Sequence, residues 1–368
     1  MKVKFNRAAL AEALGLVTSV VPSRTPKPIL QCVKITCKNS TVRICGTDLE
    51  AGINLKLEQA EIESEGEIVV PADKFNSIVR ECLDEVISVE TSDSAVNIVS
   101  SDSRFTIYGH EPEQYPLVPE FEGKPNIVVG LDKLQEGIEQ TLFAAAKEST
   151  RYAINGVLWE IKGKKLILVS TDGRRLAKAV VDLDQVSVDE IPTGRLIVPT
   201  KVLALLDKVV GGDKDEVKIQ FKDNKIIMSS GAVVVSSNLV EGNFPKYEDI
   251  IPKDNDKKVM LSTESALSAV KRAALLTNED SKGIKLALDK GEIVFTSRAP
   301  ETGDARINMA VEYSGSPIAI GFNPSFLVDV LRVMKEREFS LELGESDRPG
   351  LIKAGSNFQY IVMPVNLD

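Results

Sequence analysis

The chain has 368 residues, a length that favours two or three domains over one. Hydrophobic residues make up 43% and charged residues 27%, a balance typical of soluble globular proteins, and no stretch approaches the ~18 consecutive apolar residues of a membrane span. The net charge of −9 argues against a protein that grips nucleic acid tightly, because phosphate neutralisation requires a basic surface.

The N-terminal residues and the cysteines both predict a cytoplasmic protein. Residues 1–5 carry charges but no apolar segment follows them, so no secretory signal is expected. The four cysteines are Cys32, Cys37, Cys45 and Cys82. A disulfide framework is not expected in a chain of this size without an export signal, and the spacing fits no zinc site. We expect buried or half-buried reduced thiols.

Three segments share one pattern, a short strand that leads into an amphipathic helix. The predicted strands and helices are 3–5 with 7–20, 127–129 with 133–147, and 259–261 with 264–276. In the first helix Leu10, Leu14 and Val17 form one apolar stripe. Asp132 is expected to cap the second helix, and Ser262 or Thr263 the third.

A second strand and helix follow in each third of the chain. These pairs are 68–71 with 74–82, 196–199 with 201–209, and 318–324 with 325–334. Each third then closes with an alternating strand before a proline-bearing segment, at 105–108, 233–239 and 360–362. The repeat of roughly 120 residues is long enough to be a whole domain. We therefore predict an α+β protein of three similar domains, 1–124, 125–253 and 254–368, each with two helices covering antiparallel sheets.

The sequence offers no convincing active site. The only histidine, His110, stands apart from any candidate nucleophile, and no G-x-G-x-x-G or Walker loop occurs. Asp48 and Asp172 each follow a predicted strand and are more typical of hydrogen-bonded turns than of metal sites. We expect a non-catalytic protein without cofactor or metal. A mixed α/β enzyme is the main alternative, and a generic scaffold is the second.

Several segments together resemble the bacterial DNA polymerase III β subunit family. They are RTPKPIL at 24–30, GTDLE at 46–50, RYAING at 151–156, TDGRRLA at 171–177, FPKY at 244–247, RAALLTNE at 272–279, YSG at 313–315, GFN at 321–323 and YIVMP at 360–364. The resemblance implies three DNA-clamp domains and a head-to-tail homodimer that closes a ring around duplex DNA. It also implies processivity for DNA polymerase III and recruitment of the clamp loader, other polymerases and repair proteins through linear motifs.

A ring also answers the objection from charge. A head-to-tail interface closes into a ring when the rotation between subunits closes. Retention on DNA is then topological, so phosphate contacts can be few and weak enough to permit sliding.

The resemblance implies a peptide-binding groove at the junction of the second and third domains. Its expected residues are Ile154, Thr171, Gly173, Arg174, Arg175, Leu176, Pro245, Ile250, Asn323, Phe326, Ile361, Met363, Pro364, Val365 and Leu367. Such an apolar pocket with a polar rim suits a short linear motif. Arg175 and Asn323 are expected to contact the backbone of the partner. Arg174 departs from a histidine seen in some relatives, and Ile154 and Leu176 could instead be core residues.

The resemblance also implies DNA contacts and a dimer interface. The DNA contacts are Arg24, Lys74, Tyr152, Lys201 and Lys282. The interface residues are Phe105 and Ile107 in the first domain and Leu275 and Leu276 in the third. Asp73 and Glu148 replace basic or neutral residues of the family pattern, which makes the expected pore less basic.

Overall fold

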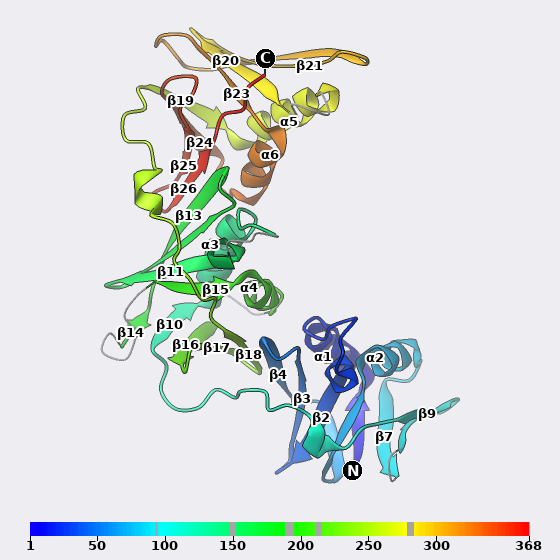
Figure 1. Cartoon of the computed structure of the whole chain (residues 1–368). Helices are drawn as coiled ribbons and strands as arrows, with labels where there is room; N and C mark the ends of the chain where they lie inside the picture. Colours follow the sequence, from blue (N-terminus) through cyan, green and yellow to red (C-terminus); the bar gives the residue numbers. More distant parts are fainter. Residues whose placement is uncertain (93–94, 148–151, 188–194, 211–214, 278–282, 368) are drawn as a thin grey trace. The chain divides into compact units, whose positions relative to one another are not determined.

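The computed structural model describes the chain except for residues 93–94, 148–151, 188–194, 211–214, 278–282 and 368 (Figure 1). The chain forms two compact units. Unit 1 consists of Met1–Gln135, Leu183–Thr193 and Lys201–Leu239, and unit 2 of Glu136–Asp182, Gly194–Thr200 and Val240–Asp368. The division passes through helices α3 (Leu131–Leu142) and α4 (Thr200–Leu206).

Unit 1 contains two antiparallel sheets. The five-stranded sheet has the order β5-β1-β7-β8-β9, with β1 Lys2–Asn6, β5 Ala60–Ser64, β7 Val86–Ser92, β8 Ala95–Val99 and β9 Arg104–Tyr108. The nine-stranded sheet has the order β14-β10-β16-β17-β18-β4-β3-β2-β6. Its strands are β2 Cys32–Lys38, β3 Thr41–Thr47, β4 Ala51–Leu57, β6 Gly66–Pro71, β10 Ile127–Gly130, β14 Gln185–Val186, β16 Glu216–Lys222, β17 Lys225–Ser230 and β18 Val233–Asn238.

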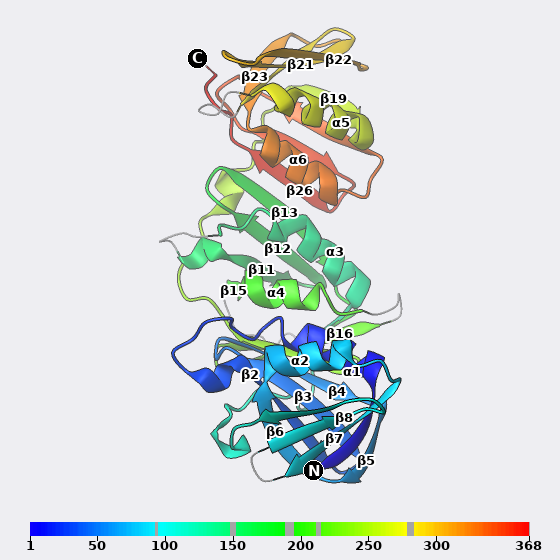
Figure 2. The ribbon, with the colours of Figure 1, turned by 90° about the vertical axis from the view of Figure 1, so that its right-hand side faces the viewer.

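Helices α1 (Arg7–Val17) and α2 (Ala72–Glu81) pack against each other and against the sheets of unit 1 (Figure 2). Leu10, Leu14 and Val17 are fully buried, which confirms the predicted apolar stripe. The helix ends three residues before the predicted boundary of 20. The Thr18 hydroxyl donates to the Leu14 carbonyl (2.7 Å), a side-chain bond that competes with continuation of the helix.

Unit 2 also contains two antiparallel sheets. The eight-stranded sheet has the order β15-β11-β12-β13-β26-β25-β24-β19. Its strands are β11 Gly156–Lys162, β12 Lys165–Thr171, β13 Arg175–Asp182, β15 Leu196–Pro199, β19 Lys257–Ser262, β24 Glu338–Leu343, β25 Gly350–Ala354 and β26 Phe358–Val362. The four-stranded sheet has the order β22-β21-β20-β23, with β20 Ile284–Asp289, β21 Glu292–Ala299, β22 Gly303–Ala310 and β23 Ile318–Phe322.

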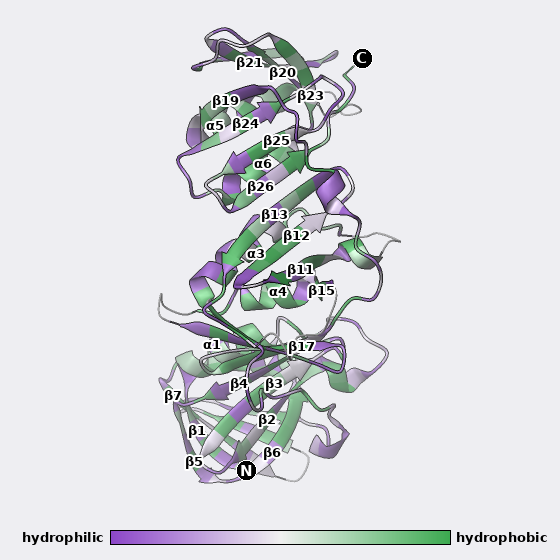
Figure 3. Ribbon diagram, turned by 90° about the vertical axis from the view of Figure 1, so that its left-hand side faces the viewer, coloured by the Kyte–Doolittle hydropathy of each residue, from purple (hydrophilic) through white to green (hydrophobic). Residues whose placement is uncertain are grey.

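Helices α5 (Thr263–Ala273) and α6 (Pro324–Val333) pack together in unit 2. The hydrophobic residues along β12 are coloured green in Figure 3. The Ser262 hydroxyl accepts from the Ser265 amide (3.3 Å), which confirms Ser262 as the cap of α5. The cap predicted at Asp132 is wrong. Helix α3 begins at Leu131, so Asp132 lies within the first turn, where a carboxylate is favourable to the helix dipole.

The predicted strand and helix pairs are present in all three thirds of the chain, and the strand pairs are antiparallel. The α+β prediction is therefore confirmed. The thiols are free, as expected, with Cys32, Cys37 and Cys82 buried and Cys45 half-buried. Burial raises the pKa of Cys32 to about 11, so this thiol stays protonated at neutral pH.

Candidate functional site

A tight turn between β12 and β13 forms the centre of the site in unit 2. The Thr171 hydroxyl donates to the Arg175 carbonyl (2.6 Å) and accepts from the Gly173 amide (3.0 Å). Asp172 Oδ1 accepts from the amides of Arg174 (2.9 Å) and Arg175 (3.1 Å). Gly173 has φ +88°, a left-handed conformation that disfavours side chains. The turn is therefore fixed by its own residues, and it leaves the Arg174 side chain exposed.

Arg175 points away from solvent. Its Nε donates to Asp172 Oδ2 (2.9 Å), its Nη1 to Asp329 Oδ2 (2.7 Å) and its Nη2 to the Phe143 carbonyl (2.9 Å). The guanidinium lies 4.5 Å from the ring centroid of Phe326. Burial opposes the charge, but the hydrogen bond to Asp329 and neighbouring groups raise the pKa of Arg175 above its ordinary value.

These contacts correct one expectation. The Arg175 side chain is 9% exposed and each of its three nitrogens donates a hydrogen bond within the chain, so its main contacts order the turn and do not face a partner backbone. Asn323 also acts locally, because its Oδ1 accepts from the Ser325 amide (2.9 Å) and caps α6.

The residues after β26 run beside this turn as an ordered tail, residues 363–367. The Met363 amide donates to the Arg174 carbonyl (2.9 Å) and the Val365 amide to the Gly321 carbonyl (2.9 Å). Pro364, between them, has no N–H to satisfy. Chain ends fray unless they are tied down, and this tail is tied at two points on different elements.

The floor of the site is apolar. Ile154, Leu176 and Ile361 belong to one buried cluster with Phe244 and Tyr247. Ile154 and Leu176 are thus core residues that close the site from below, which agrees with the alternative for these two positions. Thr171 is buried as well.

The walls of the site are more exposed. Ile250 and Met363, which are 39% and 38% exposed, line the same cavity of about 820 Å³, and most of its other lining residues are polar or charged, among them Asp254 and Arg348. Pro245 is half-buried beside Phe244. Accessible apolar side chains among polar ones suit the anchors of a short linear motif.

An ionic cluster holds the wall that contains Pro245 and Ile250. The Tyr247 hydroxyl donates to Glu160 Oε2 (2.7 Å) on β11, and Arg195 Nε lies 3.1 Å from Glu160 Oε1. Arg195 also pairs with Glu248 (2.9 Å). Burial alone would raise the pKa of Glu160, but the hydrogen bonds from Tyr247 and Lys162 hold it below its ordinary value.

The expected DNA contacts in unit 1 have exposed side chains. Arg24 lies in the loop before the short helix Pro28–Gln31, and Lys74 lies in the first turn of α2. Lys201 Nζ forms an ion pair with Asp48 and donates to the Val20 carbonyl (3.3 Å). Tyr152 begins the short helix Tyr152–Asn155 of unit 2, and Lys282 lies outside the described residues.

The expected interface residues lie at or beside edge strands. Phe105 (37% exposed) and Ile107 are on β9, an edge of the five-stranded sheet. Leu275 (79% exposed) and Leu276 follow α5, which packs against β22, an edge of the four-stranded sheet. Within the described residues, β9 and β22 each pair with one strand only. The outer edge of each therefore presents unpaired backbone groups to which a strand of another chain can bind.

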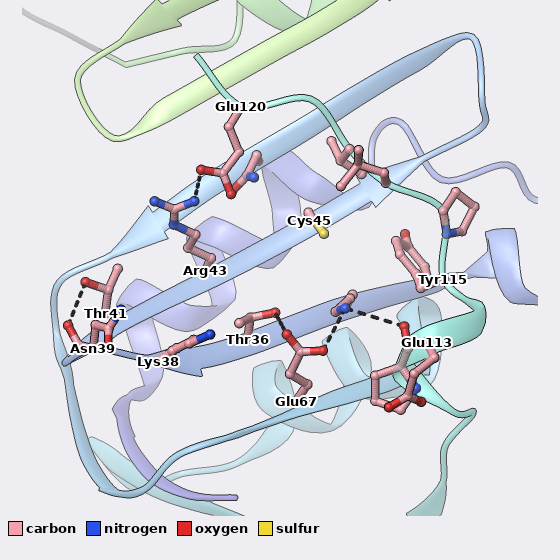
Figure 4. A pocket seen from close by; sticks show the side chains of 16 residues that line it. Thr36, Lys38, Asn39, Thr41, Arg43, Cys45, Glu67, Glu113, Tyr115 and Glu120 are labelled. Carbon is pink, nitrogen blue, oxygen red and sulfur yellow. Dashed lines mark hydrogen bonds and ion pairs between the residues drawn. The ribbon is translucent and has the colours of Figure 1, made fainter. Parts of the chain in front are cut away.

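Unit 1 has a cavity of about 530 Å³ on the nine-stranded sheet (Figure 4). Its charged side chains are largely paired with each other, as in Lys34 with Glu67 (2.8 Å) and Arg43 with Glu120.

Among the described residues, no group of three or more His, Cys, Asp or Glu side chains is placed to hold a metal ion. None of the described helices is long and apolar enough to cross a membrane.

Comparison with known proteins gives matches over nearly the whole chain. Family models described as DNA polymerase III beta subunit match the N-terminal domain at residues 1–119, the central domain at 129–246 and the C-terminal domain at 248–366. The beta sliding clamp of Pseudomonas putida is 33% identical over 370 residues, covering 100% of both chains.

Solved structures agree with these matches. The structure of a DnaN sliding clamp (DNA polymerase III subunit beta) from Pseudomonas aeruginosa bound to griselimycin has a TM-score of 0.93, 32% identity and full coverage of both chains. The DNA polymerase sliding clamp from Bacillus subtilis has a TM-score of 0.93 and 27% identity, also with full coverage of both chains.

Proposed function

This chain belongs to the DNA polymerase III beta subunit family, the beta sliding clamps, and we propose that it recruits partner proteins through a groove formed by the 171–176 turn, the 244–250 wall and the 363–367 tail. The partner segment is a short linear peptide with apolar anchors. The anchors bind beside the exposed Ile250 and Met363, and the exposed Arg174 contacts the polar part of the motif.

The observation that supports this proposal most is the ordered tail. Its two backbone hydrogen bonds, from Met363 to Arg174 and from Val365 to Gly321, hold it against two different strand ends. A flexible Met363 side chain on a fixed backbone can adapt to several related peptides.

Truncation tests the proposal. A chain that ends at Val362 should remain folded and dimeric, yet lose binding of peptides from the polymerase and the clamp loader. Peptide titration by fluorescence anisotropy measures the affinity, and sedimentation velocity checks the assembly. Undiminished peptide binding by the truncated chain would place the partner site elsewhere.

The rest of the clamp function follows the family. The chain acts as a head-to-tail homodimer that encircles duplex DNA in the cytoplasm, as a non-catalytic accessory subunit with the three domains 1–124, 125–253 and 254–368. Retention on nicked circular DNA after loading, and loss when the DNA is linearised, tests this. A scaffold without a DNA role would show no such difference, and a search for turnover tests the enzyme alternative.

A further inference from the structure

One backbone hydrogen bond recurs in all three thirds of the chain. In each, the segment after the last strand of the third donates an amide to the strand that precedes the second helix. The bonds are His110 to Val69 (2.8 Å), Val240 to Ile197 (2.9 Å) and Val365 to Gly321 (2.9 Å). The accepting strands β6, β15 and β23 are each at the edge of a sheet.

The accepting residue differs in the third case. Val69 and Ile197 are each 1% exposed and belong to buried apolar clusters. Gly321 occupies the corresponding position of β23, and its φ does not require glycine. The structure therefore favours glycine at position 321 because a side chain there would have no room.

The tail fills that space. A Cβ on Gly321 would lie 2.5 Å from the Val365 carbonyl oxygen, 2.8 Å from Leu367 Cγ and 2.9 Å from Leu367 Cδ1. Real Cβ atoms essentially never approach other atoms so closely, and the nearest of these atoms belongs to the backbone. Leu367 thus stands where the first two repeats place a side chain of their own strand.

We propose that Gly321 is the residue on which the tail, residues 363–367, packs; we call this contact the seat of the tail. Gly321 is thereby a positioning residue for peptide binding. Its missing side chain lets Val365 and Leu367 close onto β23, and this contact holds Met363 and Pro364 as a wall of the groove. Gly321 contacts no bound peptide in this account. The inference rests on the proposed function of the groove, but the seat itself can be tested without any peptide.

The variant Gly321→Val introduces the residue that the first repeat carries at this position. Valine is favourable in strands, and Val69 shows that this position of the repeat accommodates it, so β23 should still form. In the full chain the new side chain excludes Val365 and Leu367. We expect amide exchange across residues 363–367 to become at least tenfold faster, with residues 358–362 unchanged, and the peptide Kd to rise by about tenfold or more.

Two controls isolate the seat. Ser268→Ala changes an exposed residue of α5 that does not line the cavity beside the tail, and it should alter neither readout. Gly321→Val in the chain truncated at Val362 should melt within a degree or two of the truncated parent, because the clashing atoms are gone. A lower melting temperature there would mean that valine damages the strand itself, which contradicts the proposal.

The outcomes separate the two claims. Normal tail protection in full-length Gly321→Val overturns the seat, whatever the peptide affinity. Fast tail exchange with weakened peptide binding supports both claims. If the truncated chain binds peptide normally, the groove proposal fails, and tail exchange in Gly321→Val still decides whether Gly321 holds the tail.

Discussion

Asp329 on α6 accepts a 2.7 Å hydrogen bond from Arg175 on β13, so a helix of the C-terminal third is fastened to the turn at the centre of the groove. The same guanidinium is stacked near Phe326, one turn of α6 before Asp329. The contact links two family domains within unit 2 and orders the turn from behind.

We predict that Asp329→Asn destabilises the protein by about 2 kcal/mol. The substitution removes one of the two carboxylates that pair with the buried Arg175 guanidinium. Asp172 remains paired with it, and Asp329 is 36% exposed, so the cost is below that of breaking a fully buried pair. Thermal unfolding should show a fall of several degrees. Asp347→Asn is the matched control, since Asp347 is exposed and the described structure gives it no ion pair. An equal melting temperature for both variants would contradict the role of Asp329.

The Glu160 and Tyr247 contact predicts acid-dependent stability. The pKa of Glu160 lies below its ordinary 4.5, so its ionised form is stabilised on folding. That contribution is fully present above about pH 4.5 and is lost as the pH falls through the lower folded pKa. Tyr247→Phe removes one donor and should cost about 1 kcal/mol at pH 7.

The test of this prediction is a comparison of unfolding between pH 3 and pH 7. The difference in stability between the parent and Tyr247→Phe should shrink toward pH 3, because protonated Glu160 loses the benefit of the hydroxyl donor. Peptide affinity should fall several-fold at pH 7, since Tyr247 lies between Pro245 and Ile250 in the wall. A constant difference across this range would show that the Tyr247 hydroxyl does not stabilise ionised Glu160.

The sequence predicts the repeated elements well because their signals are local. The apolar stripe of α1, the Ser262 cap of α5 and the strands that precede α5 and α6 depend on residues close in the chain. The helix ends were predicted less well. Helices α1, α3, α4 and α5 each end at least three residues before the predicted boundary. At the end of α1 the Thr18 hydroxyl donates to the Leu14 carbonyl, and such a side-chain bond can compete with a further turn.

The supporting contacts of the site could not be predicted in this way. Arg175 and Asp329 are 154 positions apart, and Tyr247 and Glu160 are 87 apart. No local pattern distinguishes an arginine that lines a groove from one that is buried beneath it. The sequence does mark Gly321, because the equivalent positions of the other two repeats carry the β-branched residues Val69 and Ile197. Only the structure shows why, since the tail packs where a side chain would lie.

The ion pair of Lys201 with Asp48 predicts unequal DNA contacts. Arg24 is exposed and the described structure gives it no ion pair, whereas the charge of Lys201 is already compensated by Asp48. Arg24→Met should reduce the slope of log affinity against log salt concentration by about 1, which corresponds to the loss of one phosphate contact. Lys201→Met should reduce this slope by less. Loading assays at several salt concentrations measure both slopes. A larger effect at Lys201 would mean that DNA displaces Asp48 from this lysine.

The edge strands predict a head-to-tail dimer with two equivalent interfaces. Replacing Leu275 and Leu276 with glutamate should give monomers in sedimentation velocity, because charged side chains would then be buried against the partner. Phe105→Glu, on the opposite edge, should do the same. Leu117→Glu is the control, since Leu117 is 94% exposed in unit 1 and lies outside the edge strands. It should leave the dimer intact.

Mixing the two monomeric variants then distinguishes this arrangement from one in which each surface pairs with itself. In a head-to-tail dimer, the intact Phe105 edge of the Leu275 and Leu276 variant meets the intact Leu275 edge of the Phe105 variant, so one good interface forms between them. The mixture should therefore sediment as a dimer with a single closed junction, while each variant alone stays monomeric. Such a dimer should not be retained on circular DNA, because its second junction stays open. If the mixture remains monomeric while the Leu117 variant dimerises, Phe105 and Leu275 do not face each other across the interface.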